Sequence, residues 1–131
     1  MPSLNQLLHE ARWRRHWRLL LLALAAVSAY FAFMPISPQL ALPLWDKFNH
    51  VAAFAAMAVA AAFAQPATWR HAGTAAAVLL VYGAFIELVQ SLLPTRFADA
   101  ADLLADALGA ACGLVLAAAM RWLWRLPVTP R

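Results

Sequence analysis

Four apolar segments separated by polar or Pro-rich stretches dominate the chain and predict four membrane-crossing helices. The segments cover about residues 19–34, 46–64, 72–93 and 103–124. A helix of roughly 17–25 apolar residues crosses a bilayer, and interfacial side chains allow a short segment to cross. Because four spans use most of the 131 residues, the pattern predicts one all-α domain, residues 1–131, folded as a membrane helix bundle.

Basic and aromatic residues precede the first segment, in the order E-A-R-W-R-R-H-W-R over residues 10–18. Tryptophan prefers the headgroup level and arginine the cytoplasmic phosphate surface, so we expect residues 1–18 to form an amphipathic anchor. The run leads straight into a span, which argues against a nucleic-acid partner. A signal peptide has the same order, but we find no convincing small-x-small cleavage site before Pro35, and three further spans follow, which favours an uncleaved span.

Composition supports the membrane assignment. Hydrophobic residues make up 65% of the chain and charged residues 12%, with a mean hydropathy of +0.68. A soluble domain carries about 25% charged residues, so the lipid bilayer is the expected partner. The single cysteine, Cys112, allows no internal disulfide and no cysteine-based metal site.

Positive charges predict the orientation of the bundle. Eight of the ten Lys and Arg residues lie on one side of the predicted spans, and only Lys47 and Arg96 lie on the other. The positive-inside rule therefore places both termini in the cytoplasm. The Pro-rich stretch 36–45 then becomes an outer interfacial loop, with Trp45 as its anchor.

The same orientation gathers five of the six acidic residues in the outer half of the bundle. Glu87 and Gln90 share a helix face with Gly83, and a second face carries three aspartates followed by Gly109 and Gly113. Those aspartates are Asp99, Asp102 and Asp106. We expect two antiparallel helices joined near Pro94, with their polar ends facing each other and the glycines admitting a neighbouring helix.

A lone carboxylate at the depth of Glu87 costs roughly 2 kcal/mol or more unless it is paired or solvated. An outward-opening polar pocket would relieve that cost, and Arg96 or Lys47 would neutralise part of the charge. The expected lining comes from three helices: Asp46, His50, Glu87, Gln90, Asp102 and Asp106.

Together these residues resemble the VanZ-like family. The resemblance rests on D-K-x-x-H at residues 46–50, E-x-x-Q at 87–90, then Arg96, Asp99, Asp102 and the G-x-x-x-G at 109–113. The family often has asparagine at the position of Asp106. The resemblance implies a small multi-span protein of the bacterial inner membrane. Because the family is named for a member associated with low-level teicoplanin resistance, it also suggests a role in glycopeptide resistance or envelope stress.

Simpler structural roles exist for the same residues. Asp46 and Lys47 could form a headgroup-level pair that caps a helix, and Asp99 and Asp102 suit a helix N-terminus. Arg96 could be a solvated loop charge. An interhelical hydrogen-bond network would account for the remaining four, which are His50, Glu87, Gln90 and Asp106.

Three classes of function follow. In the first, the pocket binds or modifies a polar ligand such as the head of a cell-envelope lipid. His50 or Glu87 would then act as general base, and Arg96 or Lys47 would hold phosphate. A divalent metal is compatible with this class, and its expected ligands are His50, Glu87, Asp102 and Asp106.

The second class is a proton-coupled transporter, but the inner half of the spans lacks the polar residues of a continuous path. The third is a structural or assembly protein held together by a buried polar network. No nucleophile motif, phosphate-binding glycine loop or dinucleotide fingerprint is present, so the sequence assigns no enzyme class.

Overall fold

The computed structural model describes residues 10–35, 43–96 and 98–123, with no side-chain description for 43–45. This part of the chain holds one 3-10 turn, η1, and four long helices. Their bounds are η1 Ala11–Trp13, α2 Arg14–Phe33, α3 Pro43–Phe63, α4 Trp69–Gln90 and α5 Ala100–Leu123. The four helices predicted from the sequence are therefore confirmed, with ends that differ by a few residues.

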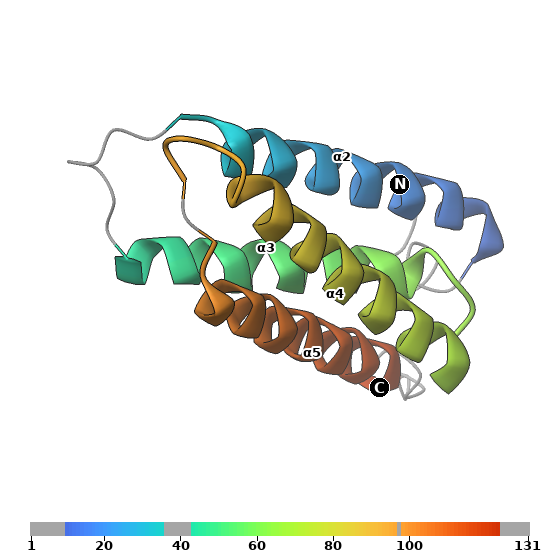
Figure 1. Cartoon of the computed structure of the whole chain (residues 1–131). Coiled ribbons are helices and arrows are strands. Elements are labelled where there is room, and N and C mark those ends of the chain that lie inside the picture. Colours follow the sequence, from blue (N-terminus) through green and yellow to red (C-terminus); the bar gives the residue numbers. More distant parts are fainter. Residues whose placement is uncertain (1–9, 36–42, 97, 124–131) are drawn as a thin grey trace, which may run out of the picture.

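The helices alternate in direction, so that α2 and α4 run opposite to α3 and α5 (Figure 1). Helix α3 contacts each of the other three, and α4 and α5 also contact each other. The predicted antiparallel pair is thus α4 and α5, joined by residues 91–99. Because α3 and α5 run in parallel, their N-terminal turns lie together at the end of the bundle where α4 ends (Figure 1).

The core is centred on α3, whose many alanines let neighbouring helices come close. Phe54, Met57 and Ala58 of α3 are almost fully buried against Leu79 of α4 and Ala110 of α5. A second cluster nearer the other end joins residues of three helices, namely Trp17, Phe63 and Ala117. These contacts bury α3 far more than α2, which has no fully buried residue.

Two glycines of α5 allow its backbone to lie against that of α3. A Cβ atom on Gly109 would collide with the carbonyl oxygen of Val51, and one on Gly113 would collide with that of Ala55. Both partners are backbone atoms of α3, which cannot move aside as a flexible side chain can. The glycine stripe predicted to admit a neighbouring helix does so, and that helix is α3.

Arginine side chains complete the C-terminal turn of α3, where backbone carbonyls have no partner within the helix. Arg121 donates to the carbonyl of Ala62 over 2.6 Å, and Arg18 donates to that of Ala64 over 3.4 Å. The basic residues at this end of the bundle therefore also tie α2 and α5 to the end of α3.

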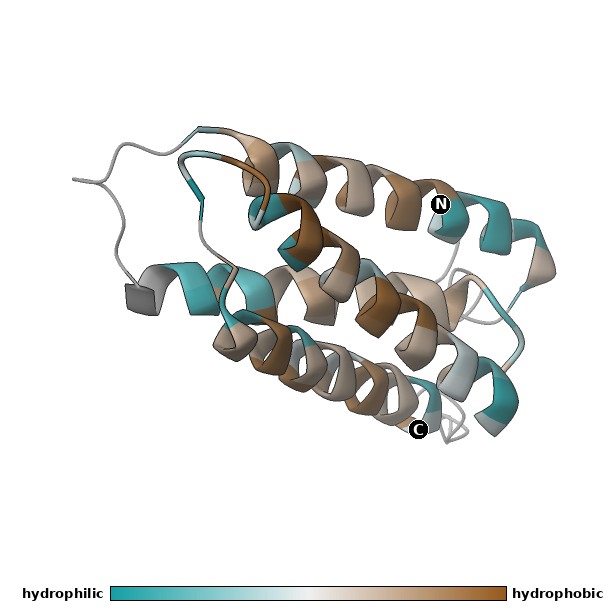
Figure 2. Ribbon diagram, in the orientation of Figure 1, coloured by the Kyte–Doolittle hydropathy of each residue, from teal (hydrophilic) through white to brown (hydrophobic). Residues whose placement is uncertain are grey.

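Three helical segments are long and apolar enough to cross a membrane. They are Ala11–Phe33, Trp69–Gln90 and Ala100–Leu123. Large apolar side chains on their outer faces are exposed, as expected for lipid-facing surfaces; examples are Leu22, Val81 and Val115. Hydrophilic residues gather near the helix ends, while the middle of the bundle is mostly apolar (Figure 2).

Helix α3 is not among these candidate spans. Its first turns carry Asp46, Lys47, Asn49 and His50, and these side chains lower the mean hydropathy of the helix. The apolar residues that follow lie in the core rather than on the outer surface. The prediction of a fourth span thus remains a prediction.

The structure describes part of the segment for which we predict an N-terminal anchor, and the anchor role remains a prediction. Residues 11–18 form η1 and the first turns of α2, and the ring of Trp17 packs 5.1 Å, centroid to centroid, from that of Phe63. The loop predicted over residues 36–45 is wrong at its end, because the backbone of residues 43–45 begins α3. Residues 1–9 and 36–42, and Arg125 and Arg131, lie outside the described residues. So does the side chain of Trp45.

The close contact between α3 and α5 generates a stability prediction. Replacement of Gly109 by alanine should lower the free energy of unfolding by about 1–3 kcal/mol, because the added methyl meets backbone rather than side chain. The matched control is Gly73→Ala on α4, where a Cβ would meet nothing within 4 Å.

Since alanine is favoured over glycine in a helix by about 1 kcal/mol, the Gly73 variant should be as stable as the parent or more so. Thermal unfolding in detergent, followed by circular dichroism, measures both. Equal melting temperatures for the two variants would show that α3 and α5 do not pack as described.

Candidate functional site

A ladder of charged side chains joins the first turns of α3 to the start of α5. Lys47 Nζ donates to Asp99 Oδ2 over 2.7 Å and to Asp102 Oδ1 over 2.8 Å. The Asp102 side chain is 7% exposed and that of Asp99 51% exposed. Lys47 therefore neutralises a buried carboxylate, where pairing matters most, and a second one in contact with solvent.

A second charged pair lies about one helical turn further along α3 and joins His50 to Asp106. The distance between Nδ1 and Oδ1 is 2.8 Å, and Asp106 is fully buried. An ionised carboxylate only accepts hydrogen bonds, so in the ion-paired form Nδ1 carries the hydrogen. The carboxylate then fixes the orientation of the ring, and Nε2 is the nitrogen left for another partner.

Glu87 reaches this cluster from α4. Its Oε2 accepts from the backbone N–H of Asp99 over 2.8 Å, which ties the end of α4 to the beginning of α5. Glu87 Oε1 and Asp106 Oδ2 are buried without a hydrogen-bond partner among the described residues. Gly83 leaves the room that Asp106 occupies, since a Cβ there would meet Oδ2.

Asp99 combines two structural tasks in the loop before α5. Its Oδ1 accepts from the Ala101 N–H over 2.8 Å, as a capping residue does, while Oδ2 pairs with Lys47. The hydrogen bond from Lys47 and, next, that from Ala101 hold the pKa of the Asp99 carboxyl below its usual value. The capping role considered for Asp99 is therefore present.

Gln90 and Arg96 bind the C-terminal turn of α2 rather than an acidic residue. Gln90 Nε2 donates to the carbonyl of Ala32 over 3.1 Å, and Arg96 Nε donates to that of Met34 over 3.1 Å. Arg96 Nη2 reaches the carbonyl of Phe31 over 2.5 Å. Burial lowers the pKa of Arg96, against the opposing effect of Asp46.

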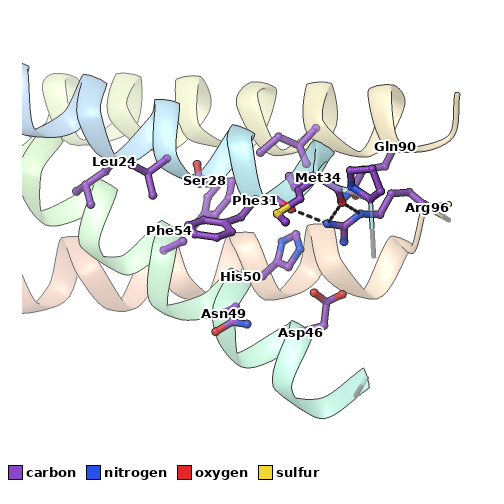
Figure 3. A pocket seen from close by; sticks show the side chains of 15 residues that line it. Leu24, Ser28, Phe31, Met34, Asp46, Asn49, His50, Phe54, Gln90 and Arg96 are labelled. Atoms are coloured by element: carbon purple, nitrogen blue, oxygen red, sulfur yellow. Dashed lines mark hydrogen bonds between the residues drawn. The ribbon is translucent and has the colours of Figure 1, made fainter. Parts of the chain in front are cut away.

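A pocket of about 660 Å³ lies between α2, α3 and α4 (Figure 3). Asp46 and His50 point into it from α3 toward Arg96, and these three form a polar end together with Asn49 and Gln90. The remainder is mainly apolar and extends along α2. Its lining there includes Leu24, Val27, Ser28, Phe31, Ala53, Phe54 and Ile86.

The predicted site residues thus separate into two layers. Asp46, His50, Gln90 and Arg96 line the pocket. The others lie outside its lining, in the ladder and its contact with α4: Lys47, Glu87, Asp99, Asp102 and Asp106. Asp46 has no ion-pair or hydrogen-bond partner among the described residues.

Sequence reasoning missed the contribution of α2 to the pocket. Ser28 and Tyr82 lie 2.8 Å apart, oxygen to oxygen, and Tyr82 also donates to the carbonyl of Ala25 over 2.6 Å. A serine and a tyrosine inside apolar spans are a signal that could have indicated this contact. Asn49, beside His50 in the sequence, was also not singled out.

Ligand atoms with a spacing suited to a metal ion come from Asp46, His50 and Asp102, which lie within 4.8 Å of one another. The set expected from the sequence shares His50 and Asp102 with this group. The group includes Asp46, which was not among the expected ligands, and it does not include Glu87 or Asp106.

A comparison with known families matches residues 3–123 to the VanZ/LLP1 family model, which confirms the resemblance drawn from the sequence. No curated protein and no solved structure gives a significant match. Together with the three membrane-capable helices, the family match makes this a membrane protein.

The contact between Glu87 and Asp99 generates a prediction that separates hydrogen bonding from charge. Glu87→Gln keeps an oxygen that accepts from the Asp99 N–H, and should leave the melting temperature unchanged or raise it, because it removes a buried charge. Glu87→Leu removes the acceptor and should lower the free energy of unfolding by about 1–3 kcal/mol.

Thermal unfolding of both variants in the same detergent provides the measurement. If Glu87→Gln were as destabilising as Glu87→Leu, the negative charge itself would hold the helices together, contrary to the hydrogen-bond account.

Proposed function

Since the chain belongs to the VanZ/LLP1 family, we propose that it is a bacterial inner-membrane protein that binds an amphipathic cell-envelope ligand. The proposed site is the pocket between α2, α3 and α4. The polar head of the ligand would bind at Asp46, His50, Gln90 and Arg96, and its apolar part would lie along α2.

The observation that carries this proposal is the separation of polar and apolar side chains at opposite ends of the pocket. Ionisable and amide side chains gather at one end, while Leu24, Val27 and Phe31 of α2 line the other with Phe54 and Ile86. Ligand sites are commonly apolar with a few placed polar groups that orient the ligand. A lipid or lipid-linked precursor has this division, and it would enter from the bilayer.

The proposed orientation places the polar end of the pocket outside the cytoplasm. Lys47 and Arg96 lie at that end, whereas Arg18 and Arg121 lie at the opposite end, against the last turn of α3. The excess of arginine at the latter end supports cytoplasmic termini under the positive-inside rule. All four helices would then cross the bilayer, with the polar start of α3 at the outer surface.

The partners of the two cations distinguish their roles toward a ligand. Lys47 is held by two carboxylates and lies outside the pocket lining, so it is not proposed as a phosphate clamp. Arg96 also donates to backbone carbonyls of α2 but lines the pocket, so it is the cation that would meet the head of the ligand. Catalysis is a second candidate, because His50, oriented by Asp106, is placed to act as a general base in the pocket.

A role in teicoplanin resistance or in envelope stress belongs to this proposal through the family resemblance. Binding an envelope precursor is one physical route to such a role.

The competing proposals use the same residues differently: a structural network would need only the ladder, and a proton-coupled transporter would need a polar path beyond Ser28 and Tyr82.

A large side chain at Ala53 should abolish ligand binding. Ala53 lines the pocket, so Ala53→Phe would fill space that the apolar part of the ligand needs. The neighbouring Ala52 is exposed and absent from the lining, which makes Ala52→Phe a matched control. We expect Ala53→Phe alone to weaken lipid binding at least tenfold, about 1.4 kcal/mol, and so to co-purify with less lipid.

Native mass spectrometry of protein extracted in mild detergent measures the bound lipid, and circular dichroism verifies the fold. Equal lipid content in a folded Ala53→Phe protein and in its control would contradict pocket binding. Proton or solute flux in reconstituted vesicles that Glu87→Gln abolishes would favour the transporter instead.

A separate experiment tests the proposed orientation of the protein in the membrane. A cysteine at Thr95 in a Cys112→Ala background should react with a membrane-impermeant thiol reagent added to intact spheroplasts, since Thr95 follows α4 at the proposed outer end. Reaction only after the membrane is opened would reverse the topology. A cysteine at Ala67, in the turn between α3 and α4, should show the opposite accessibility.

A further inference from the structure

We propose that Asp46, His50 and Asp102 bind a divalent transition-metal ion at the polar end of the pocket. One candidate ligand atom from each residue lies within 4.8 Å of the others. Asp46 and His50 are one turn apart on α3, and Asp102 comes from the parallel helix α5. The ladder between α3 and α5 holds the two helices in the register that brings these residues together.

The chemistry of the ligands selects the class of ion. Two carboxylates and one imidazole suit Mn²⁺ or Zn²⁺, whereas Mg²⁺ and Ca²⁺ prefer oxygen ligands throughout. Three protein ligands leave coordination positions for water or a ligand. The inferred ion is therefore Mn²⁺ or Zn²⁺ in an open site.

His50 is already oriented for this purpose. Its Nδ1 faces Asp106 Oδ1 at 2.8 Å, which leaves Nε2 as the nitrogen for a metal. Metal-binding histidines commonly donate their second N–H to a carboxylate, which fixes the ring and makes the ligating nitrogen more basic. Asp106 would thus orient His50 without binding the metal itself.

The charge balance of the cluster supplies an independent argument. Five carboxylates gather at this end of the bundle, and Lys47 is the only Lys or Arg that forms an ion pair with them among the described residues. Asp46 and Glu87 take part in no such pair. A divalent cation held by Asp46, His50 and Asp102 would offset part of this negative charge.

A buried acceptor without a donor belongs to the same polar cluster. Glu87 is 9% exposed, and its Oε1 has no hydrogen-bond partner among the described residues. Its carboxylate interacts electrostatically with His50 and Asp102, two of the three proposed ligands. A divalent ion beside them would supply the positive charge that this oxygen lacks.

Asp102 serves both Lys47 and the proposed ion. Lys47 takes its Oδ1, so Oδ2 is the oxygen available to a metal. The ion pair with Lys47 also holds the Asp102 side chain in place, and thereby reduces the conformational entropy that metal binding would otherwise cost.

This inference deepens the proposed function but can fail separately from it. Asp46 and His50 also line the pocket, so an ion held by them would favour an anionic ligand head, a phosphate or a carboxylate. The metal is nevertheless tested alone, without any lipid. A chain that binds no metal could still retain lipid in the pocket.

The test uses the full-length protein, purified in detergent and treated with a chelator. Mn²⁺ is titrated in while electron paramagnetic resonance follows the signal of the free ion. We expect one saturable site per chain, and a tenfold excess of Mg²⁺ should not displace Mn²⁺. Asp46→Asn should weaken binding at least tenfold, and Asp106→Asn should weaken it about 10- to 100-fold.

Asp99→Asn is the matched control, because Asp99 is acidic and pairs with the same lysine but is not in the ligand set. It should leave Mn²⁺ affinity within twofold of the parent. Asp46 has no ion-pair partner among the described residues, so Asp46→Asn should keep its melting temperature. Absence of a saturable site, undiminished binding by Asp46→Asn, or equal losses in Asp46→Asn and Asp99→Asn would overturn the proposal.

Discussion

The ion-paired contact between α3 and α5 is the constraint on which the rest of the structure depends. Charged side chains at this depth of an apolar bundle are stable only when they are paired or hydrogen-bonded. Lys47 and His50 meet Asp99, Asp102 and Asp106 across two parallel helices. The pairs set the register of the helices, and the glycines that follow on α5 let their backbones touch.

This arrangement divides the polar residues by their accessibility. The ladder occupies the contact of α3 with α5, where Asp102 and Asp106 are buried. Asp46 and the imidazole of His50 lie on the pocket side of α3. Since Gln90 and Arg96 hold the last turn of α2, the same polar end also fixes the helix that provides most of the apolar lining. Structural roles and the proposed binding role thus fall to neighbouring residues of one cluster.

Hydropathy and helical periodicity were sufficient to predict the four helices and the antiparallel pair α4 and α5, because both depend on local pattern. The spacing of Asp46 and His50 likewise predicted a shared face. The position of the pocket could not be predicted, since α2 contributes apolar side chains that would equally suit contact with lipid. The partners of Arg96 could not be predicted either, because they are backbone carbonyls, which no residue type in the sequence identifies. Asp106 was assigned to a pocket wall but lies behind His50.

The central claim is that Asp106 fixes His50 so that the ring presents Nε2 to the pocket. The most direct measurement is ¹⁵N NMR of the His50 ring in chelator-treated protein, compared with Asp106→Asn. With the imidazole neutral, the account predicts hydrogen on Nδ1 and an unprotonated Nε2 in the parent protein, and a large change in the Nδ1 shift in the variant. A ring that carries its hydrogen on Nε2, with shifts that do not respond to Asp106→Asn, would contradict the account.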